Sequence, residues 1–60
     1  MKKKVTVNYE DGGSLIYRGY HKEDDYYFIN NHRFSIGVVS ITRQYYPLKD
    51  NEEVVIFSKK

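Results

Sequence analysis

Apolar and aromatic residues recur along this chain with a period of two, and this alternation constrains the fold more than any other feature. Val5, Val7 and Tyr9 alternate with Thr6 and Asn8. In an extended strand, this places the first set on one face and the second on the other. No long segment shows the i, i+3, i+4, i+7 spacing of an amphipathic helix. The sequence therefore predicts an all-β fold.

Turn residues divide the pattern into short strands. Asp11-Gly12-Gly13 predicts a tight hairpin, because glycine readily adopts the positive φ angles that such turns require. A second hairpin is expected at Asn30-Asn31, since asparagine tolerates the left-handed region. We expect the strand just before it, with apolar residues on both sides, to be the most buried. The expected strands are residues 4–10, 14–20, 26–29, 32–46 with a corner at Gly37, and 54–57.

The core must be built from aromatic side chains. The chain has 60 residues with seven Tyr, three Phe and no Cys, and a chain of this length buries only about 60% of its unfolded surface. We expect a single small β domain over residues 1–60. Closing the sheet would remove its exposed edges, so a five-stranded, strongly bent antiparallel sheet or a small barrel is predicted.

Two stretches resemble the Sm-like and SH3-like small β-barrels. Val5-x-Val7-x-Tyr9-Glu10-Asp11-Gly12 is similar to their first strand and its turn, and Phe34-x-Ile36-x-x-Val39 is similar to the rhythm near their last strands. The resemblance, over about residues 4–42, implies a barrel of that kind. The RNA-contact motif and the amino-terminal helix of true Sm proteins are missing from this pattern. Relatives of the barrel include RNA binders, inhibitors and ligand sensors, so the resemblance leaves function open.

Charge and composition exclude several classes of partner. Ten basic and eight acidic residues give a net charge of +2, too weak a field for a protein that coats DNA. Lys2-Lys3-Lys4 is followed by alternating residues rather than by the apolar run of an export signal, and no stretch suits a membrane span. We expect a cytoplasmic protein without a membrane partner. Abundant Lys, Asn, Ile and Tyr fit an AT-rich coding sequence such as that of a low-GC bacterium or its phage.

Catalytic and metal-binding patterns are missing from the sequence. No nucleophile, base and oxyanion holder share a recognisable spacing, and no Gly-Lys-Ser/Thr follows Gly12-Gly13. His21 and His32 would bind a metal only if the fold brought them to the acidic run Glu23–Asp25, and solvated turns are the simpler interpretation. We therefore expect no enzyme activity, no metal and no cofactor.

The surplus of tyrosine points to a binding surface. Seven tyrosines cannot all enter so small a core, and adjacent residues of a strand face opposite sides, so at least two should be exposed. Exposed tyrosine and arginine are typical of protein interfaces. The candidate binding residues are Tyr17, Arg18, Tyr20, Arg43, Tyr45 and Tyr46.

These residues support two hypotheses. In the first, they bind a larger protein, and the chain is an adaptor or inhibitor, in keeping with a phage origin. In the second, the rings stack on the bases of single-stranded RNA or DNA while the arginines and terminal lysines hold phosphates. The acidic residues at 23–25, 50, 52 and 53 would repel a nucleic acid unless they lay on another face, which favours protein. Pairing of edge strands between copies, giving a homo-oligomer, is a further option.

Overall fold

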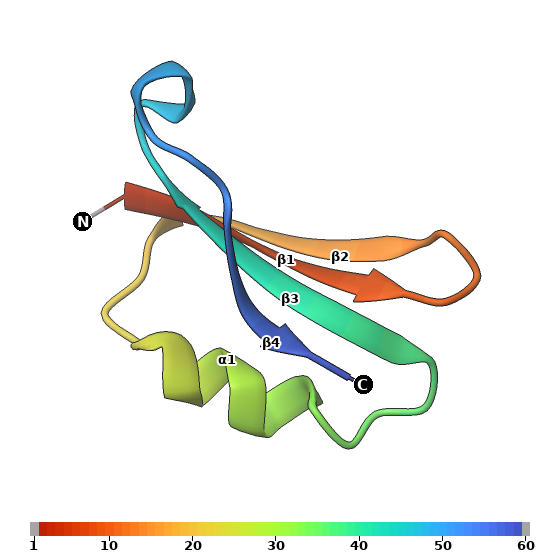
Figure 1. Ribbon diagram of the computed structural model, residues 1–60. Coiled ribbons are helices and arrows are strands. Elements are labelled where there is room, and N and C mark those ends of the chain that lie inside the picture. Colours follow the sequence, from red (N-terminus) through yellow and green to blue (C-terminus); the bar gives the residue numbers. More distant parts are fainter. Residues whose placement is uncertain (1, 60) are drawn as a thin grey trace.

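The computed structural model describes residues 2–59, which form four strands and one α-helix (Figure 1). The chain order is β1 (Lys2–Tyr9), β2 (Ser14–Tyr20), α1 (Asp25–His32), β3 (Val38–Tyr45), a single 3₁₀ turn (Leu48–Asp50) and β4 (Val54–Ser58). The strands make one antiparallel sheet in the order β2-β1-β3-β4. The helix lies along one face of this sheet (Figure 1). The fold is therefore mostly β, as the alternation predicts.

The prediction of five strands and of a closed barrel is wrong. The sheet is open, with β2 and β4 as its two edges. The error lies in residues 26–36, which were expected to form a strand, a hairpin and the start of another strand. They form α1 and the turns after it, and Asn30 and Asn31 lie inside the helix. A helix that covers one face buries the apolar side of the sheet without closure into a barrel.

The helix forms because its ends are capped and one of its rings is buried. The carboxylate of Asp24 accepts a hydrogen bond from the N–H of Tyr27 at 3.1 Å, which is the N-cap interaction that satisfies a free donor of the first turn. At the other end, the N–H of Arg33 binds the carbonyl of Ile29 at 2.8 Å. The helix buries Phe28 and partly buries Ile29 against the sheet. Two turns are too short to show a helical period in the sequence.

The first hairpin and its strands are confirmed. The N–H of Tyr9 binds the carbonyl of Gly13 at 2.9 Å, and Gly12 has a φ of 92°. The carboxylate of Asp11 also accepts a hydrogen bond from the N–H of Gly13 at 2.8 Å. These turn contacts set the pairing of β1 with β2, in which Val5 lies opposite Tyr17.

The register separates the side chains of the sheet into two faces. Partners directly across a ladder lie on the same side, so Val5 shares its face with Tyr17 on β2 and Arg43 on β3. This is the helix face, because Phe28 packs against Val5 there. The opposite side of the sheet is here called the outer face. The core on the helix face consists of Val5, Val7, Phe28, Val38 and Ile41, with Tyr9, Tyr17, Ile29, Ile56 and Phe57 at its margin.

Candidate functional site

The six candidate binding residues lie on two different faces. Alternation along β2 places Tyr17 on the helix face but Arg18 and Tyr20 on the outer face. On β3, Arg43 and Tyr45 lie on the helix face. Tyr46 lies beyond the end of β3, and its N–H donates a hydrogen bond to the carbonyl of Lys2. The Lys2 ammonium lies over the Tyr46 ring, 4.8 Å from the ring centroid. The six residues therefore contribute to two sites rather than to one.

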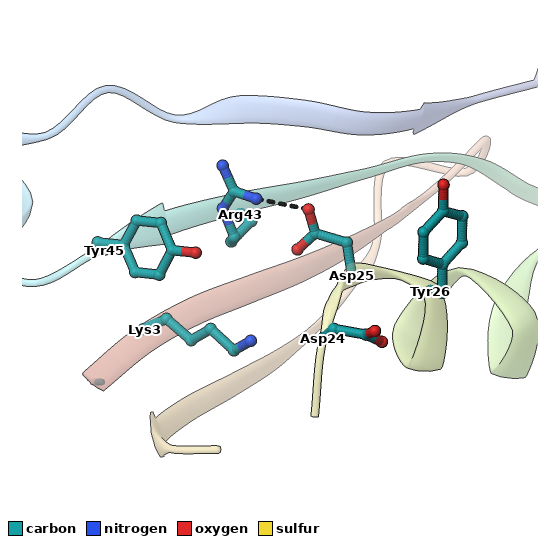
Figure 2. A pocket seen from close by; sticks show the side chains of 6 residues that line it. All are labelled: Lys3, Asp24, Asp25, Tyr26, Arg43 and Tyr45. Carbon is teal, nitrogen blue, oxygen red and sulfur yellow. Dashed lines mark hydrogen bonds and ion pairs between the residues drawn. The ribbon is translucent and has the colours of Figure 1, made fainter. Parts of the chain in front are cut away.

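A polar hollow lies where the first turn of α1 meets the sheet. It has a volume of about 230 Å³ and is lined by Lys3, Asp24, Asp25, Tyr26, Arg43 and Tyr45. Figure 2 shows Asp25 facing Arg43 from β3, while the carboxylate of Asp24 points away from Lys3. The hollow brings together two of the predicted residues, Arg43 and Tyr45, with a lysine and two aspartates.

Both cations of the hollow have a partner within the protein, but only Arg43 pairs with a carboxylate. Arg43 Nη1 lies 2.5 Å from Asp25 Oδ2, and the guanidinium also lies 4.8 Å from the ring centroid of Tyr45. Lys3 is only 6% exposed; its Nζ donates to the carbonyl of Glu23 at 2.5 Å and lies 5.4 Å from the Phe28 ring centroid. The hollow therefore ties the start of α1 and the residue before its cap to two strands, through one ion pair and one hydrogen bond to a backbone carbonyl.

The two histidines pack beside Tyr17, one of them also against Phe28. His32 Nε2 lies 2.9 Å from the hydroxyl of Tyr17, and the His21 ring packs edge-on against Tyr17 and Phe28. His21 Nδ1 is 3.7 Å from a carboxylate oxygen of Glu23. Within residues 2–59, no three His, Cys, Asp or Glu side chains converge in a way that could hold a metal ion.

The second site is on the outer face and is basic. Across the β1–β2 ladder, Lys4 lies opposite Arg18, Lys2 opposite Tyr20, and Thr6 opposite Ile16. Tyr20 is 81% exposed and Ile16 is 43% exposed. None of the residues that the register places in these rows is acidic. We call this surface the basic patch; it comprises Lys2, Lys4, Ile16, Arg18, Tyr20 and Tyr46.

The β3–β4 connection packs against the outer face of β3. The amide of Gln44 donates to the carbonyls of Leu48 and Asn51 at 2.9 and 2.8 Å. The hydroxyl of Thr42 donates to a carboxylate oxygen of Glu53 at 2.9 Å. On the β1–β2 side of the outer face, Lys2, Ile16, Arg18 and Tyr20 are exposed and Lys4 is half-buried, whereas Thr6 is only 9% exposed.

Some site residues could be read from the sequence and others could not. Alternation places Lys2 and Lys4 on one face of a strand, and both were among the lysines expected to contact phosphate. Lys3, the middle residue of the same run, is instead buried on the helix face. Ile16 was not predicted as part of a site, because both faces of β2 carry bulky side chains and the sequence alone does not say which one is covered.

The exposure of the tyrosines agrees with the expectation that at least two face the solvent. Tyr20, Tyr26 and Tyr27 are all exposed, whereas Tyr17 is half-buried against Phe28, with ring centroids 5.3 Å apart. Tyr26 and Tyr27 reach solvent from the helix rather than from a strand. Tyr17 is therefore a core residue of the helix face and not part of the basic patch.

Comparison with known proteins adds no relative. No family of known sequences, no curated protein and no solved structure matches this chain. Among the described residues, no helix is long and apolar enough to cross a membrane.

Proposed function

We propose that this protein is a non-catalytic binding module that binds a larger protein through the basic patch, as an adaptor or inhibitor of the kind a phage directs at a host protein. The observation that carries the proposal is the placement of Arg18, Tyr20 and the two lysines on one accessible sheet face with no acidic residue in their rows. The partner surface would present carboxylates opposite these cations.

The composition of the basic patch suits a protein partner. Arginine and tyrosine are the residues most often found at the energetic centres of protein interfaces, and Arg18 and Tyr20 lie on the same face of β2. Ile16, 43% exposed, adds an apolar contact beside them. The patch lies over two paired strands. Small molecules bind in concave clefts that bury most of their surface, so an exposed sheet surface suits a protein partner better than a small molecule.

Single-stranded nucleic acid is the second candidate, supported by one further observation. The acidic run at residues 23–25 lies in the β2–α1 connection, where Asp24 and Asp25 line the hollow on the helix face. The repulsion of this run is thus directed away from the basic patch, whereas the carboxylate of Glu53 binds Thr42 on the outer face. Against this candidate, the ring of Tyr46 is covered by the Lys2 ammonium at 4.8 Å. Tyr20 is then the one ring of the basic patch that is fully available for stacking.

Affinity capture tests the choice of partner. The tagged protein is incubated with lysate with and without nuclease, in parallel with a double variant, Lys4→Glu with Arg18→Glu, which reverses the central charges of the basic patch. Lys22→Glu, an exposed cation in the β2–α1 connection, is the matched control. The proposal expects one discrete protein that survives nuclease, is lost with the double variant and is kept with the control. A protein kept equally by all three would show that the basic patch is not the binding surface.

A direct titration tests the nucleic-acid candidate. Binding of a fluorescent oligo-dT is measured by anisotropy over a series of salt concentrations. Three phosphate contacts, through Lys2, Lys4 and Arg18, predict a log–log slope of about −2. Binding with that slope, abolished by the double charge reversal, would place nucleic acid first. Failure to bind, or a flat salt response, would remove this candidate.

A further inference from the structure

The connection between α1 and β3 carries two almost fully exposed apolar side chains. Ile36 is 97% exposed and Phe34 is 85% exposed. The sequence rhythm predicted these residues as part of a strand, but they project from the turns that follow the helix. Scattered exposed apolar side chains are ordinary, whereas grouped ones are candidates for a contact surface. We call residues 33–37 the apolar tip.

Backbone hydrogen bonds hold the apolar tip in one conformation. The N–H of Ser35 binds the carbonyl of His32 at 3.0 Å, and the N–H of Val38 binds the carbonyl of Ser35 at 3.3 Å. The carbonyl of Gly37 accepts from the N–H of Glu10 at 2.7 Å, and Gly37 has a φ of 90°, which a larger residue adopts poorly. The two apolar side chains are therefore presented by an ordered loop, which lowers the entropy lost when they are covered.

Opposite charges flank the apolar tip. The guanidinium of Arg33 lies 5.0 Å from the ring centroid of Phe34. At the carboxyl end of the tip, Glu10 lies next to Gly37, whose carbonyl accepts a hydrogen bond from the Glu10 N–H. Both Arg33 and Glu10 are exposed, and within residues 2–59 neither forms an ion pair. The surface is thus an apolar centre with one unmatched cation and one unmatched anion at its border.

We propose that the apolar tip joins two copies of this chain across a twofold axis. In such a contact the same surface meets itself, so Phe34 and Ile36 of each copy pack on those of the other. With the axis between Arg33 and Glu10, the Arg33 of each copy lies against the other copy's Glu10. This self-complementarity of charge favours a second copy over a partner of a single charge sign.

The contact is small, so the dimer is weak and reversible. Two apolar side chains and one charged pair per copy cover much less than the roughly 800 Å² per partner of a standard interface. The apolar tip shares no residue with the basic patch. The dimer therefore does not rest on the proposed function, and it would carry two basic patches, which strengthens binding to a repeated or dimeric partner.

Sedimentation equilibrium of the full chain over a concentration series up to about 1 mM tests the proposal. The wild type is expected to shift from monomer to dimer, and Phe34→Ser with Ile36→Asp is expected to stay monomeric. The matched control is Val55→Asp, which changes an apolar residue on β4 that is 61% exposed, and it should still dimerise. Circular dichroism checks that each variant is folded. A wild type that stays monomeric throughout, or a dimer that survives the double change at the tip, overturns the proposal.

Charge reversal provides an independent readout. Arg33→Glu and Glu10→Arg should each weaken the dimer by roughly three- to tenfold, because each places like charges opposite one another. Combined in one chain, the two changes restore an opposite-charge pair and should return the dissociation constant close to the wild-type value. If the double variant instead weakens the dimer by the two single losses of binding free energy added together, Arg33 and Glu10 do not meet across the contact.

Discussion

Arg43 and Asp25 form an ion pair between β3 and the first residue of α1, with Arg43 Nη1 and Asp25 Oδ2 2.5 Å apart. The two side chains are 18% and 33% exposed, respectively, so the pair is shielded from solvent but not fully buried. It is the direct link between the start of the helix and a central strand. Arg43, a residue expected to bind a partner, is therefore engaged within the fold.

A double-mutant cycle should show that this pair contributes to stability. Asp25→Asn and Arg43→Met are each expected to lower the free energy of unfolding by about 1–2 kcal/mol, with a coupling of about 1 kcal/mol. Urea denaturation followed by circular dichroism measures both quantities. Asp50→Asn, an exposed residue of the 3₁₀ turn, serves as control and should change stability by less than about 0.5 kcal/mol. Strictly additive single effects would contradict the coupling.

Lys3 should be replaceable by methionine at little cost. Its ammonium is buried with one carbonyl partner, and no carboxylate lies within ion-pair distance among residues 2–59. Methionine keeps most of the stem while removing the charge that must be desolvated, so we expect stability within about 1 kcal/mol of the wild type. Lys3→Ala also removes the packing of the stem and should cost more. If the two variants lose the same stability in thermal unfolding, the ammonium of Lys3, rather than its aliphatic stem, contributes to stability.

Phe28 should be the most sensitive position of the helix. It is 1% exposed and packs in the core with Val5, Val7 and Ile41. Phe28→Ala is expected to cost about 3–5 kcal/mol, most of the stability available to a domain of this size. The matched change Tyr26→Ala removes a ring that is 71% exposed and should cost less than about 1 kcal/mol. Far-ultraviolet circular dichroism during urea titration compares them; similar midpoints for both variants would contradict the burial of Phe28.

The N-cap of α1 gives a fourth prediction. Asp24 accepts the hydrogen bond from the N–H of Tyr27, so Asp24→Ala should lower the free energy of unfolding by about 1 kcal/mol. Asp24→Ser keeps a capping oxygen and should recover most of that loss. The N–H of Tyr27 also lies 3.2 Å from the backbone carbonyl of Asp24, which both variants keep, so the difference in its amide exchange between the alanine and serine variants reports the side-chain cap, with faster exchange expected for alanine. Equal exchange rates in the two variants would show that the side-chain cap is not formed.

The sequence by itself determined the strands whose pattern is local. Alternation and the Asp11-Gly12-Gly13 turn define β1, β2 and their hairpin, because a two-residue side-chain period and a glycine turn act over neighbouring residues. The strands before and after Pro47 were predicted for the same reason. The number of tyrosines was enough to predict that at least two are exposed, since seven large rings exceed what so small a core can hold.

Only the tertiary structure decided which secondary structure residues 26–36 adopt. Tyr26–Ile29 has the composition of a strand, and it becomes helical because Asp24 caps it and Phe28 finds its place in the core against the sheet. Once this helix covers one face, Phe34 and Ile36 are left outside the core. Tertiary burial outweighs local β-propensity here.

The division of the candidate site into two also came from the tertiary structure. Alternation shows that Tyr17 and Arg18 face opposite ways, but it does not say which way is inward, because both faces of β2 carry large side chains. The helix settles this by covering the face of Val5, Tyr17 and Arg43. It leaves Arg18 and Tyr20 accessible. Which residues can reach a partner thus depends on a packing choice between segments distant in sequence, which no local pattern contains.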